Sequence, residues 1–265
     1  MLQISATQLP YAQVQYLNTQ AKWNDTSGKW NLGGNKFLQG SKQAVRWKLI
    51  RGLGVSDQAV RHFTTHFNQQ LVVTGVCPSG LAEHIGKTAA ALPGGNDSIE
   101  NRLESVLQEL HNDAILDKTK APNIVVLLLS NKNQSIYSNF KWLADKRYCF
   151  QAICATENNF KPAHKSGGWN HDAGMRQYMA NIAMKANLKV AGINHTVPGV
   201  RDWLSTTLIL GSDLTHPGNG AVDNCPSIAA VVSSVEKTGG RFFGQLFLQK
   251  KSDVSLLIDK SHSTA

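Results

Sequence analysis

Hydrophobic and polar positions alternate along much of the chain in a way that predicts strands and helices in turn. The short apolar runs typical of strands are residues 47–50, 71–76, 124–129 and 152–155. The stretches with helical spacing are residues 56–69, 98–110, 172–186 and a helix after Gln134. The unbroken run 124–129 is typical of a central parallel strand covered on both faces. Strands that alternate with helices predict a doubly wound α/β layer.

The pattern changes past Gly192, where three apolar runs follow one another with only turns between them. Residues 208–210, 228–235 and 241–249 therefore predict a three-strand antiparallel meander. A three-stranded sheet without covering helices cannot bury both faces. We expect this part to be the less stable one, and the chain to be a segment of a longer protein.

Residues 1–44 differ from the rest because they are rich in Gln, Asn, Gly and Ser and have poor helical periodicity. Trp23, Trp30 and Phe37 are interspersed among them, so we expect an extended connector that packs through its aromatic side chains. These patterns divide the chain into a connector (1–44), an α/β domain (45–195) and the start of a strand-rich domain (196–265).

Composition narrows the class of protein. The 265 residues are 42% hydrophobic and 17% charged, as in soluble globular proteins. The longest apolar run is too short to span a membrane, and the N-terminus lacks a signal-peptide pattern. Four scattered cysteines without Cys-x-x-Cys spacing predict free thiols, with no disulfide partner and no zinc. We expect a cytoplasmic protein, and a nuclear location is also compatible with these features.

The net charge of +9 is concentrated in one stretch. Between Lys118 and Lys189 there are eleven Lys and Arg residues against three acidic ones, which accounts for nearly all of the excess. A lysine-rich solvated surface is one interpretation. A one-sided basic cluster also favours binding of a polyanion such as nucleic acid.

Two pairs of residues within this stretch are spaced so that the members of each pair would share one face of a helix. Tyr137 and Lys141 are four residues apart and would share one face of a helix, as would Lys185 and Lys189. A phenol ring offers a stacking surface for a base, and ammonium groups make charge-assisted hydrogen bonds to phosphate. Taken singly, Tyr137 also fits a packing residue, and the last two lysines also fit complements of a helix dipole.

One carboxylate follows the run 208–210 directly, in the sequence Gly211-Ser212-Asp213. The run predicts a buried strand that places Asp213 at its C-terminal end. A carboxylate there either caps the following turn or holds a divalent cation, and spacing alone leaves both possible.

The order of these motifs resembles that of eukaryotic, fungal-like Argonaute proteins. Tyr137-x3-Lys141, after the run 124–129, and Lys185-x3-Lys189 are similar to the signature of the family's MID domain, and Asp213-Leu-Thr-His-Pro to the opening of its PIWI domain. The resemblance implies a linker-like connector and a Rossmann-like MID domain with a parallel sheet and flanking helices. An incomplete ribonuclease-H-like PIWI portion would follow.

The resemblance also implies that the chain binds the 5′-phosphorylated end of a small guide RNA. The implied binding residues are Tyr137, Lys141, Lys185 and Lys189. This chain has Ile153 where the family commonly has a glutamine, so Thr156 or Gln151, with Asn181, would be accessory. The loop expected to face the first base consists of Ser130, Asn131, Lys132, Asn133 and Gln134.

In the resembled family the residue at Asp213 is the first ligand of a nuclease metal site. Two-metal hydrolysis needs several converging carboxylates, and only Asp213 has the family context here. We therefore expect Mg²⁺, target RNA and cleavage to belong to a full-length parent, and no cofactor or catalysis for this chain by itself.

Two other interpretations compete with this one. The stretch from Gly80 to Thr88 is similar to the P-loop of NTPases, but five residues separate its glycines instead of four. Alternatively, the chain is a truncated product without function, whose lysines bind any polyanion weakly.

Overall fold

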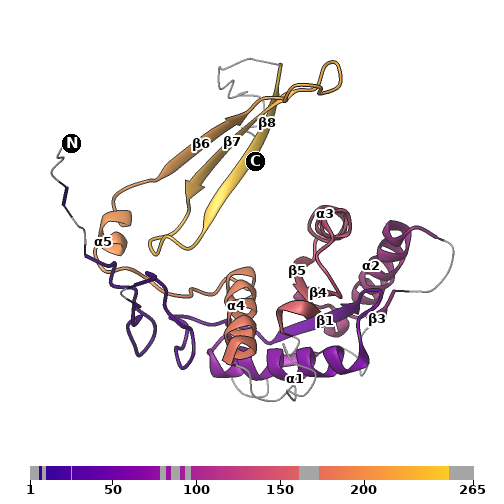
Figure 1. The fold of residues 1–265 in the computed structure, drawn as a ribbon, viewed down its shortest axis with the longest axis horizontal. Coiled ribbons are helices and arrows are strands. Elements are labelled where there is room, and N and C mark those ends of the chain that lie inside the picture. The colour runs from indigo at the N-terminus through magenta and orange to yellow at the C-terminus, as the bar shows by residue number, and fades with distance from the viewer. Residues whose placement is uncertain are drawn as a thin grey trace. The chain divides into compact units, whose positions relative to one another are not determined.

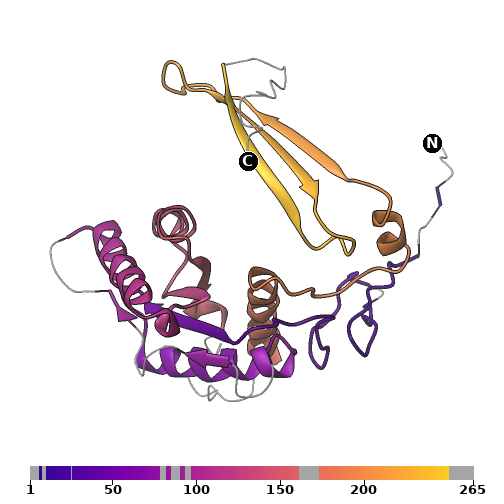
Figure 2. The same ribbon diagram turned by 180° about the vertical axis from the view of Figure 1, so that it is seen from behind.

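The computed structural model describes residues 6–7, 10–24, 26–77, 82–84, 90–92, 97–160 and 173–250. It consists of two compact units, residues 1–195 and 196–265, which we describe separately. Figures 1 and 2 show the elements of each unit from opposite sides.

The helices are α1 (Asp57–Val73), α2 (Ile99–Leu116), α3 (Gln134–Trp142), α4 (Ala173–Lys189) and α5 (Val200–Leu204). The strands are β1 (Val45–Arg51), β2 (Ala82–His84), β3 (Ala90–Ala91), β4 (Ile124–Leu129), β5 (Gln151–Thr156), β6 (Leu210–Thr215), β7 (Ser227–Ser234) and β8 (Phe242–Gln249). Short 3₁₀ turns lie at Lys118–Lys120 and Glu157–Asn159, and a π-helical turn at Leu143–Arg147.

The first unit is built on a parallel sheet in the order β2-β1-β4-β5, with β3 also paired to β1. Every residue of β4 is buried, whereas β5 lies at the edge of the sheet. Helix α1 lies along one side with α4 packed against it, and α2 and α3 lie on the other side (Figures 1 and 2). The predicted α/β class, with an antiparallel three-strand portion after it, is confirmed.

Polar residues at the starts of the helices satisfy backbone groups that would otherwise lack partners. The Ser56 hydroxyl accepts a hydrogen bond from the Ala59 amide at the start of α1. Asn133 does the same for Ile136 at the start of α3. Such caps contribute about 1 kcal/mol each and fix where a helix begins, which matters for α3 because its first turn borders the candidate site.

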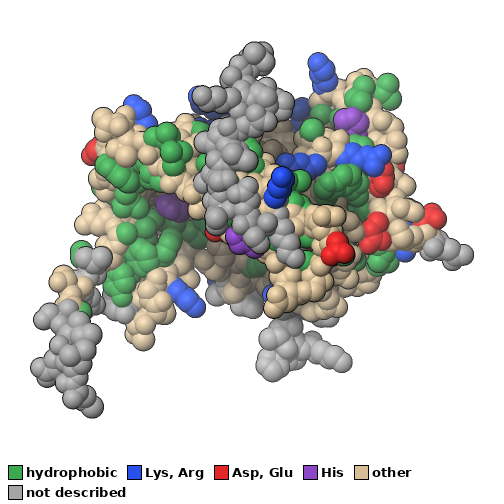
Figure 3. Space-filling model, turned by 90° about the horizontal axis from the view of Figure 1, so that it is seen from above, with side chains coloured by type: hydrophobic (Ala, Val, Ile, Leu, Met, Phe, Trp, Pro, Cys, Tyr) green, Lys and Arg blue, Asp and Glu red, His purple; other side chains and the backbone are tan. Residues whose placement is uncertain are grey.

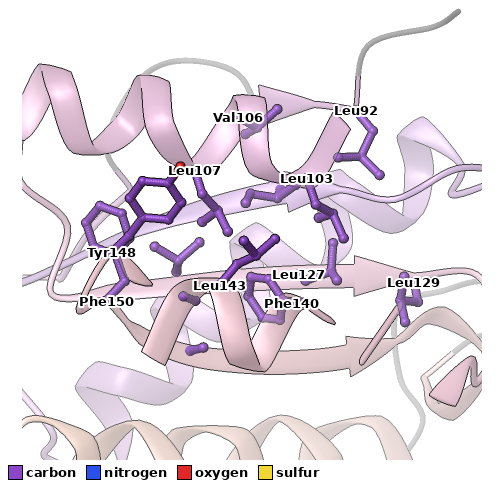
Figure 4. Packing of buried hydrophobic residues seen from close by; sticks show 14 residues of the cluster. Leu92, Leu103, Val106, Leu107, Leu127, Leu129, Phe140, Leu143, Tyr148 and Phe150 are labelled. Atoms are coloured by element: carbon purple, nitrogen blue, oxygen red, sulfur yellow. The ribbon is translucent and has the colours of Figure 1, made fainter. Parts of the chain in front are cut away.

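A hydrophobic core of the first unit lies between the sheet and the helices α2 and α3 (Figure 4). Leu103 and Leu107 of α2 face Leu127 of β4, and Phe140 of α3 completes the layer. All four side chains are fully buried. The core therefore ties α3 firmly to the strands beside it.

The N-terminal segment packs onto this unit through aromatic side chains. Tyr16 and Phe37 are buried, and the Trp30 indole donates a hydrogen bond to the Tyr16 hydroxyl at 2.8 Å. Tyr11 stacks on Trp23 with ring centroids 5.3 Å apart. The segment is held by these rings and by backbone contacts, with isolated bridges in place of a sheet of its own.

The second unit contains the antiparallel sheet β6-β7-β8. Its apolar side chains are largely exposed, with Leu210 65%, Phe243 66% and Leu246 71% accessible to solvent. The predicted meander and its uncovered faces are confirmed. Among the described helices of the chain, none has both the length and the hydropathy that crossing a membrane requires.

Three predictions about elements were wrong. The run 71–76 is not a strand: α1 continues to Val73 because Phe63, Phe67 and Leu71 form one buried helical stripe. The run 208–210 is not a buried strand, because Leu208 and Leu210 are 63% and 65% exposed. Asp213 does not end its strand either, since β6 continues to Thr215 through pairing with β7.

Two leucines of α2 provide a test of the core. Leu107→Ala should lower the free energy of unfolding by about 2–5 kcal/mol, because a fully buried side chain leaves a cavity. Leu116→Ala, in the last turn of the same helix and 85% exposed, should change it by less than about 0.5 kcal/mol. Urea unfolding followed by circular dichroism measures both. Equal effects would contradict the packing described here.

Candidate functional site

A cavity of about 260 Å³ opens beyond the C-terminal ends of β4 and β5. It is lined by Leu129, Lys132, Asn133, Gln134, Tyr137, Cys154 and Thr156. Ligands of open α/β sheets commonly bind at this end of the strands. The N-terminus of α3 borders the cavity, so backbone amides of its first turn add a partial positive charge there.

The loop expected to face a base is held in place at its first two residues. The Ser130 hydroxyl donates to the Leu53 carbonyl oxygen at 3.3 Å, and the Asn158 amide donates to Asn131. The next three residues, Lys132, Asn133 and Gln134, line the cavity. The loop thus presents one cation and two amide side chains to any occupant.

Helix α3 carries Tyr137 and Lys141 on one face, as their spacing predicts. Tyr137 lines the cavity and is 44% exposed, so its ring is available for stacking. The Lys141 ammonium donates to the carbonyl oxygen of Ala152 on β5 at 3.2 Å and forms an ion pair with Asp145. Lys141 is therefore drawn toward the edge of the sheet.

Helix α4 brings Lys185 and Lys189 to the same strand from the opposite face of the sheet. Lys189 donates to the Gln151 side chain at 3.5 Å, while Lys185 is exposed. Burial lowers the pKa of Lys189 below its usual range, and the neighbouring Lys141 ammonium lowers it further. The Asp145 carboxylate acts in the opposite direction. We call Lys141, Lys185 and Lys189 the lysine cluster.

Cys154 of β5 connects the lysine cluster with the cavity. Burial raises the pKa of its thiol to about 11, although Lys141 and Lys185 are close enough to lower it. The thiol is therefore protonated and unreactive at neutral pH. Cys154 lines the cavity together with Tyr137, and Lys141 and Lys185 lie close enough to act on its thiol, although the lysine cluster is not among the residues described around the cavity.

A buried polar network fixes the end of α4 that carries Lys185 and Lys189. The fully buried Asn187 amide donates to the Gln39 carbonyl oxygen at 3.1 Å and to the Asn194 side chain at 2.9 Å. The Asn194 side-chain amide in turn donates to the Met184 carbonyl oxygen. A side chain at Gly192 would lie 2.0 Å from Asn187, so glycine is required there. The N-terminal segment thereby helps position the lysines.

The three residues predicted to be accessory, Thr156, Gln151 and Asn181, do not all lie at the cavity. Thr156 lines the cavity, and its backbone amide donates to the Tyr178 hydroxyl at 3.2 Å. Gln151 contacts Lys189 at the far end of β5, and Ile153 is buried. Asn181 is half-buried one turn before Lys185, and neither it nor Gln151 is among the residues described around the cavity.

Asp213 does not form a metal site in the described part of the chain. It is exposed in the middle of β6, opposite Ala230 of β7. Among the described residues, no three His, Cys, Asp or Glu side chains come together. A single carboxylate does not fit the several ligands that a catalytic metal pair needs, so we derive no reaction step from it.

Two sequence features fall partly or wholly outside the described residues. Of the P-loop-like stretch from Gly80 to Thr88, only residues 82–84 are described, as β2. The strand expected before it, at 71–76, is the end of α1 and the turn after it. The Gly- and His-rich residues 161–171 lie outside the described part.

Lys and Arg side chains are spread over the face drawn in Figure 3 in small groups among hydrophobic and uncharged side chains. No continuous basic surface appears on that face.

The sequence matches a known family over half of its length. A family model described as Piwi domain matches residues 124–259. Protein argonaute 10 of Arabidopsis thaliana is 28% identical over 210 residues, which are 76% of this chain and 19% of that protein. Protein argonaute 1B of Oryza sativa subsp. japonica is 28% identical over 204 residues, 71% of this chain and 17% of that protein. The chain spans about a fifth of the length of these curated relatives.

Solved structures show the same fold. The C-terminal lobe of a budding yeast Argonaute superposes with a TM-score of 0.66 at 21% identity, covering 92% of this chain and 49% of that one. The MID-PIWI domains of N. crassa QDE-2 give 0.62 at 22% identity, covering 80% and 54%. Kluyveromyces polysporus Argonaute with a guide RNA gives 0.69 at 21% identity, covering 92% and 29%.

The lowered pKa of Lys189 predicts how stability depends on pH. Between that lowered pKa and the ordinary value near about 10.4, the unfolded chain binds more protons than the folded one, so stability rises with pH. At neutral pH the charged, partly buried ammonium is destabilising. Lys189→Met should therefore raise the melting temperature at pH 7, by about 1–2 °C because solvent screens the site.

The advantage of Lys189→Met should shrink as the pH approaches 10. Thermal melts of wild type and variant across this range measure it. Lys118→Met, at an exposed lysine before β4, is the matched control and should show no such trend. A variant less stable than wild type at pH 7, or an advantage that does not change with pH, would contradict this account.

Proposed function

We propose that the chain, which belongs to the Piwi family, binds the 5′-phosphorylated end of a small guide RNA. The binding site would be the cavity beside β5. The observation that carries the proposal is that Lys141 and Lys185 lie near Cys154, which lines the cavity together with the Tyr137 ring, while Lys189 lies close to Lys141. These groups come from α3 on one face of the sheet and α4 on the other. Together they provide cations for a phosphoryl group and a surface for a base.

The electrostatics of the lysine cluster favour an anionic occupant. Lys141 and Lys189 lie close enough for each charge to act on the other, which is unfavourable while the site is empty. A phosphate monoester carries about −1.5 to −2 charges at pH 7 and three acceptor oxygens. Its binding would replace repulsion with charge-assisted hydrogen bonds, which are about twice as strong as neutral ones.

The cavity supports a nucleotide end in preference to a free anion. Its volume is slightly below the range of about 300–1,000 Å³ typical of small-molecule sites, so it suits a single nucleotide end. The half-exposed Tyr137 ring supplies a stacking surface, and Asn133 and Gln134 supply amide groups for the base edge. Stacking tolerates any base, so the loop would set a preference through hydrogen bonds.

The similar Kluyveromyces polysporus structure is described as an Argonaute with a guide RNA, which supports a nucleic-acid ligand for this fold. For a full-length parent we propose RNA-mediated silencing with pairing to a target RNA, in the cytoplasm or nucleus. Mg²⁺-dependent cleavage would belong to that parent. For this chain we propose binding without catalysis, because among the described residues no three His, Cys, Asp or Glu side chains come together as a metal site would need.

Removing single lysines tests the phosphate contact. Lys141→Ala and Lys185→Ala should each weaken binding of a short 5′-phosphorylated RNA by about 10- to 100-fold, because a hydrogen bond to a charged group contributes about 1.5–3 kcal/mol. Binding of the same RNA with a 5′-hydroxyl should change far less. Fluorescence anisotropy at fixed salt measures both RNAs.

Lys118→Ala is the matched control, because it removes the same charge at a different place. Lys118 precedes the N-terminal end of β4, whereas the cavity lies beyond its C-terminal end. It should lower the affinity for both RNAs slightly and equally. Equal affinity of the wild type for the two RNAs would mean nonspecific polyanion binding and would overturn the proposal.

Tyr137 provides a second, separate test. Tyr137→Ala should weaken binding of both the 5′-phosphorylated and the 5′-hydroxyl RNA by about 5- to 100-fold, because it removes a stacking surface worth about 1–3 kcal/mol per base. Tyr137→Phe keeps the ring and should bind nearly as well as wild type. A loss in Tyr137→Phe as large as in Tyr137→Ala would show that the hydroxyl, not stacking, carries the contact.

A further inference from the structure

Asp145 is an anion placed within the proposed phosphate site. It lies in the π-helical turn Leu143–Arg147, which follows α3 directly, and its carboxylate forms an ion pair with the Lys141 ammonium. Both side chains are partly buried, 32% and 26% exposed. The lysine that would contact a phosphate is thus already held by a carboxylate of the chain itself.

The geometry of this pair is poorly suited to stabilising a helix. Lysine precedes aspartate at a spacing of four, and that order is less favourable than the reverse, in which the acid comes first. Partly exposed pairs of this kind contribute little to stability in general. Single π-helical turns are rare and frequently occur at functional sites.

Asp145 acts on more than one lysine. Besides pairing with Lys141, it lies close enough to Lys189 to oppose the lowering of that lysine's pKa. The lysine cluster and Asp145 together bring three positive charges and one negative charge to the edge of β5. Their formal net charge is +2, equal in size to the charge of a phosphate monoester dianion.

We propose that Asp145 is a specificity-determining residue that limits the charge of the 5′ end the site accepts. Without a ligand its carboxylate is paired with the Lys141 ammonium. With a 5′-monophosphate bound, the site is close to neutral, whereas a 5′-triphosphate brings further negative charge next to the carboxylate. The site therefore selects a monophosphorylated RNA end over a triphosphorylated one. This inference rests on the proposed function.

The experiment compares one RNA sequence carrying a 5′-hydroxyl, a 5′-monophosphate or a 5′-triphosphate. Dissociation constants are measured with the full chain as wild type, Asp145→Asn and Asp145→Glu. The selectivity is the dissociation constant of the triphosphate RNA divided by that of the monophosphate RNA. It should fall about tenfold in Asp145→Asn, because a charge repulsion at short range is removed, and persist in Asp145→Glu.

Glu104→Gln is the matched control. Glu104 pairs with Arg147 at 2.7 Å, at the end of the same π-helical turn, so its neutralisation changes the net charge equally and also breaks an ion pair. It should tighten binding of all three RNAs slightly and leave the selectivity unchanged. Circular dichroism establishes that each variant is folded, and Asp145→Ser replaces Asp145→Asn if the latter is not.

The outcomes separate the two proposals. Suppose that the wild type prefers the monophosphate to the hydroxyl RNA, and that Asp145→Asn leaves the selectivity unchanged. This result overturns the role of Asp145 and keeps the proposed function. Equal binding of monophosphate and triphosphate RNA by the wild type does the same. A wild type that does not distinguish the monophosphate from the hydroxyl RNA overturns the proposed function and this inference with it.

Discussion

The parallel pairing of the buried strand β4 with the edge strand β5 positions every group of the candidate site. Because β4 is buried on both faces, helices pack on each side of the sheet. Among the described strands, β5 is the outermost one beside β4. Helix α3 reaches that edge from one face and α4 from the other. The lysines meet there as a consequence of the topology, although more than 40 residues separate Lys141 from Lys185 in the sequence.

The crowding of ammonium groups at this edge is unfavourable for the empty fold. Burial and the charge of Lys141 both disfavour the protonated form of Lys189, and the chain offsets part of this cost with Asp145 and with carbonyl and amide oxygens of β5. The end of α4 is held by Asn187 and Asn194 through hydrogen bonds that do not involve the lysines. The fold therefore keeps its cations in place without a ligand, as expected of a preorganised anion site.

The sequence predicted those parts of the fold that follow from local patterns. The run 124–129 and the helical spacing of 98–110 corresponded to β4 and α2, and the spacing of Tyr137 and Lys141 placed both on one face of α3. The end of α1 was predicted as a strand because Leu71, Val72 and Val73 are apolar in a row, although the spacing of four between Phe63, Phe67 and Leu71 is that of one helical stripe. The proposed role of Asp145 was not predicted from the sequence, although its spacing from Lys141 was visible, because the charge balance depends on α4. The short strands β2 and β3 had no local signal.

The most direct test of the account is the protonation of Lys189, followed by NMR of its ε-methylene group during a pH titration with and without a 5′-phosphorylated RNA. The account predicts a pKa below the ordinary value near about 10.4 in the free chain, and a rise when the RNA binds, because a dianion replaces repulsion with attraction. An unchanged titration of Lys189 in the presence of saturating RNA would contradict it.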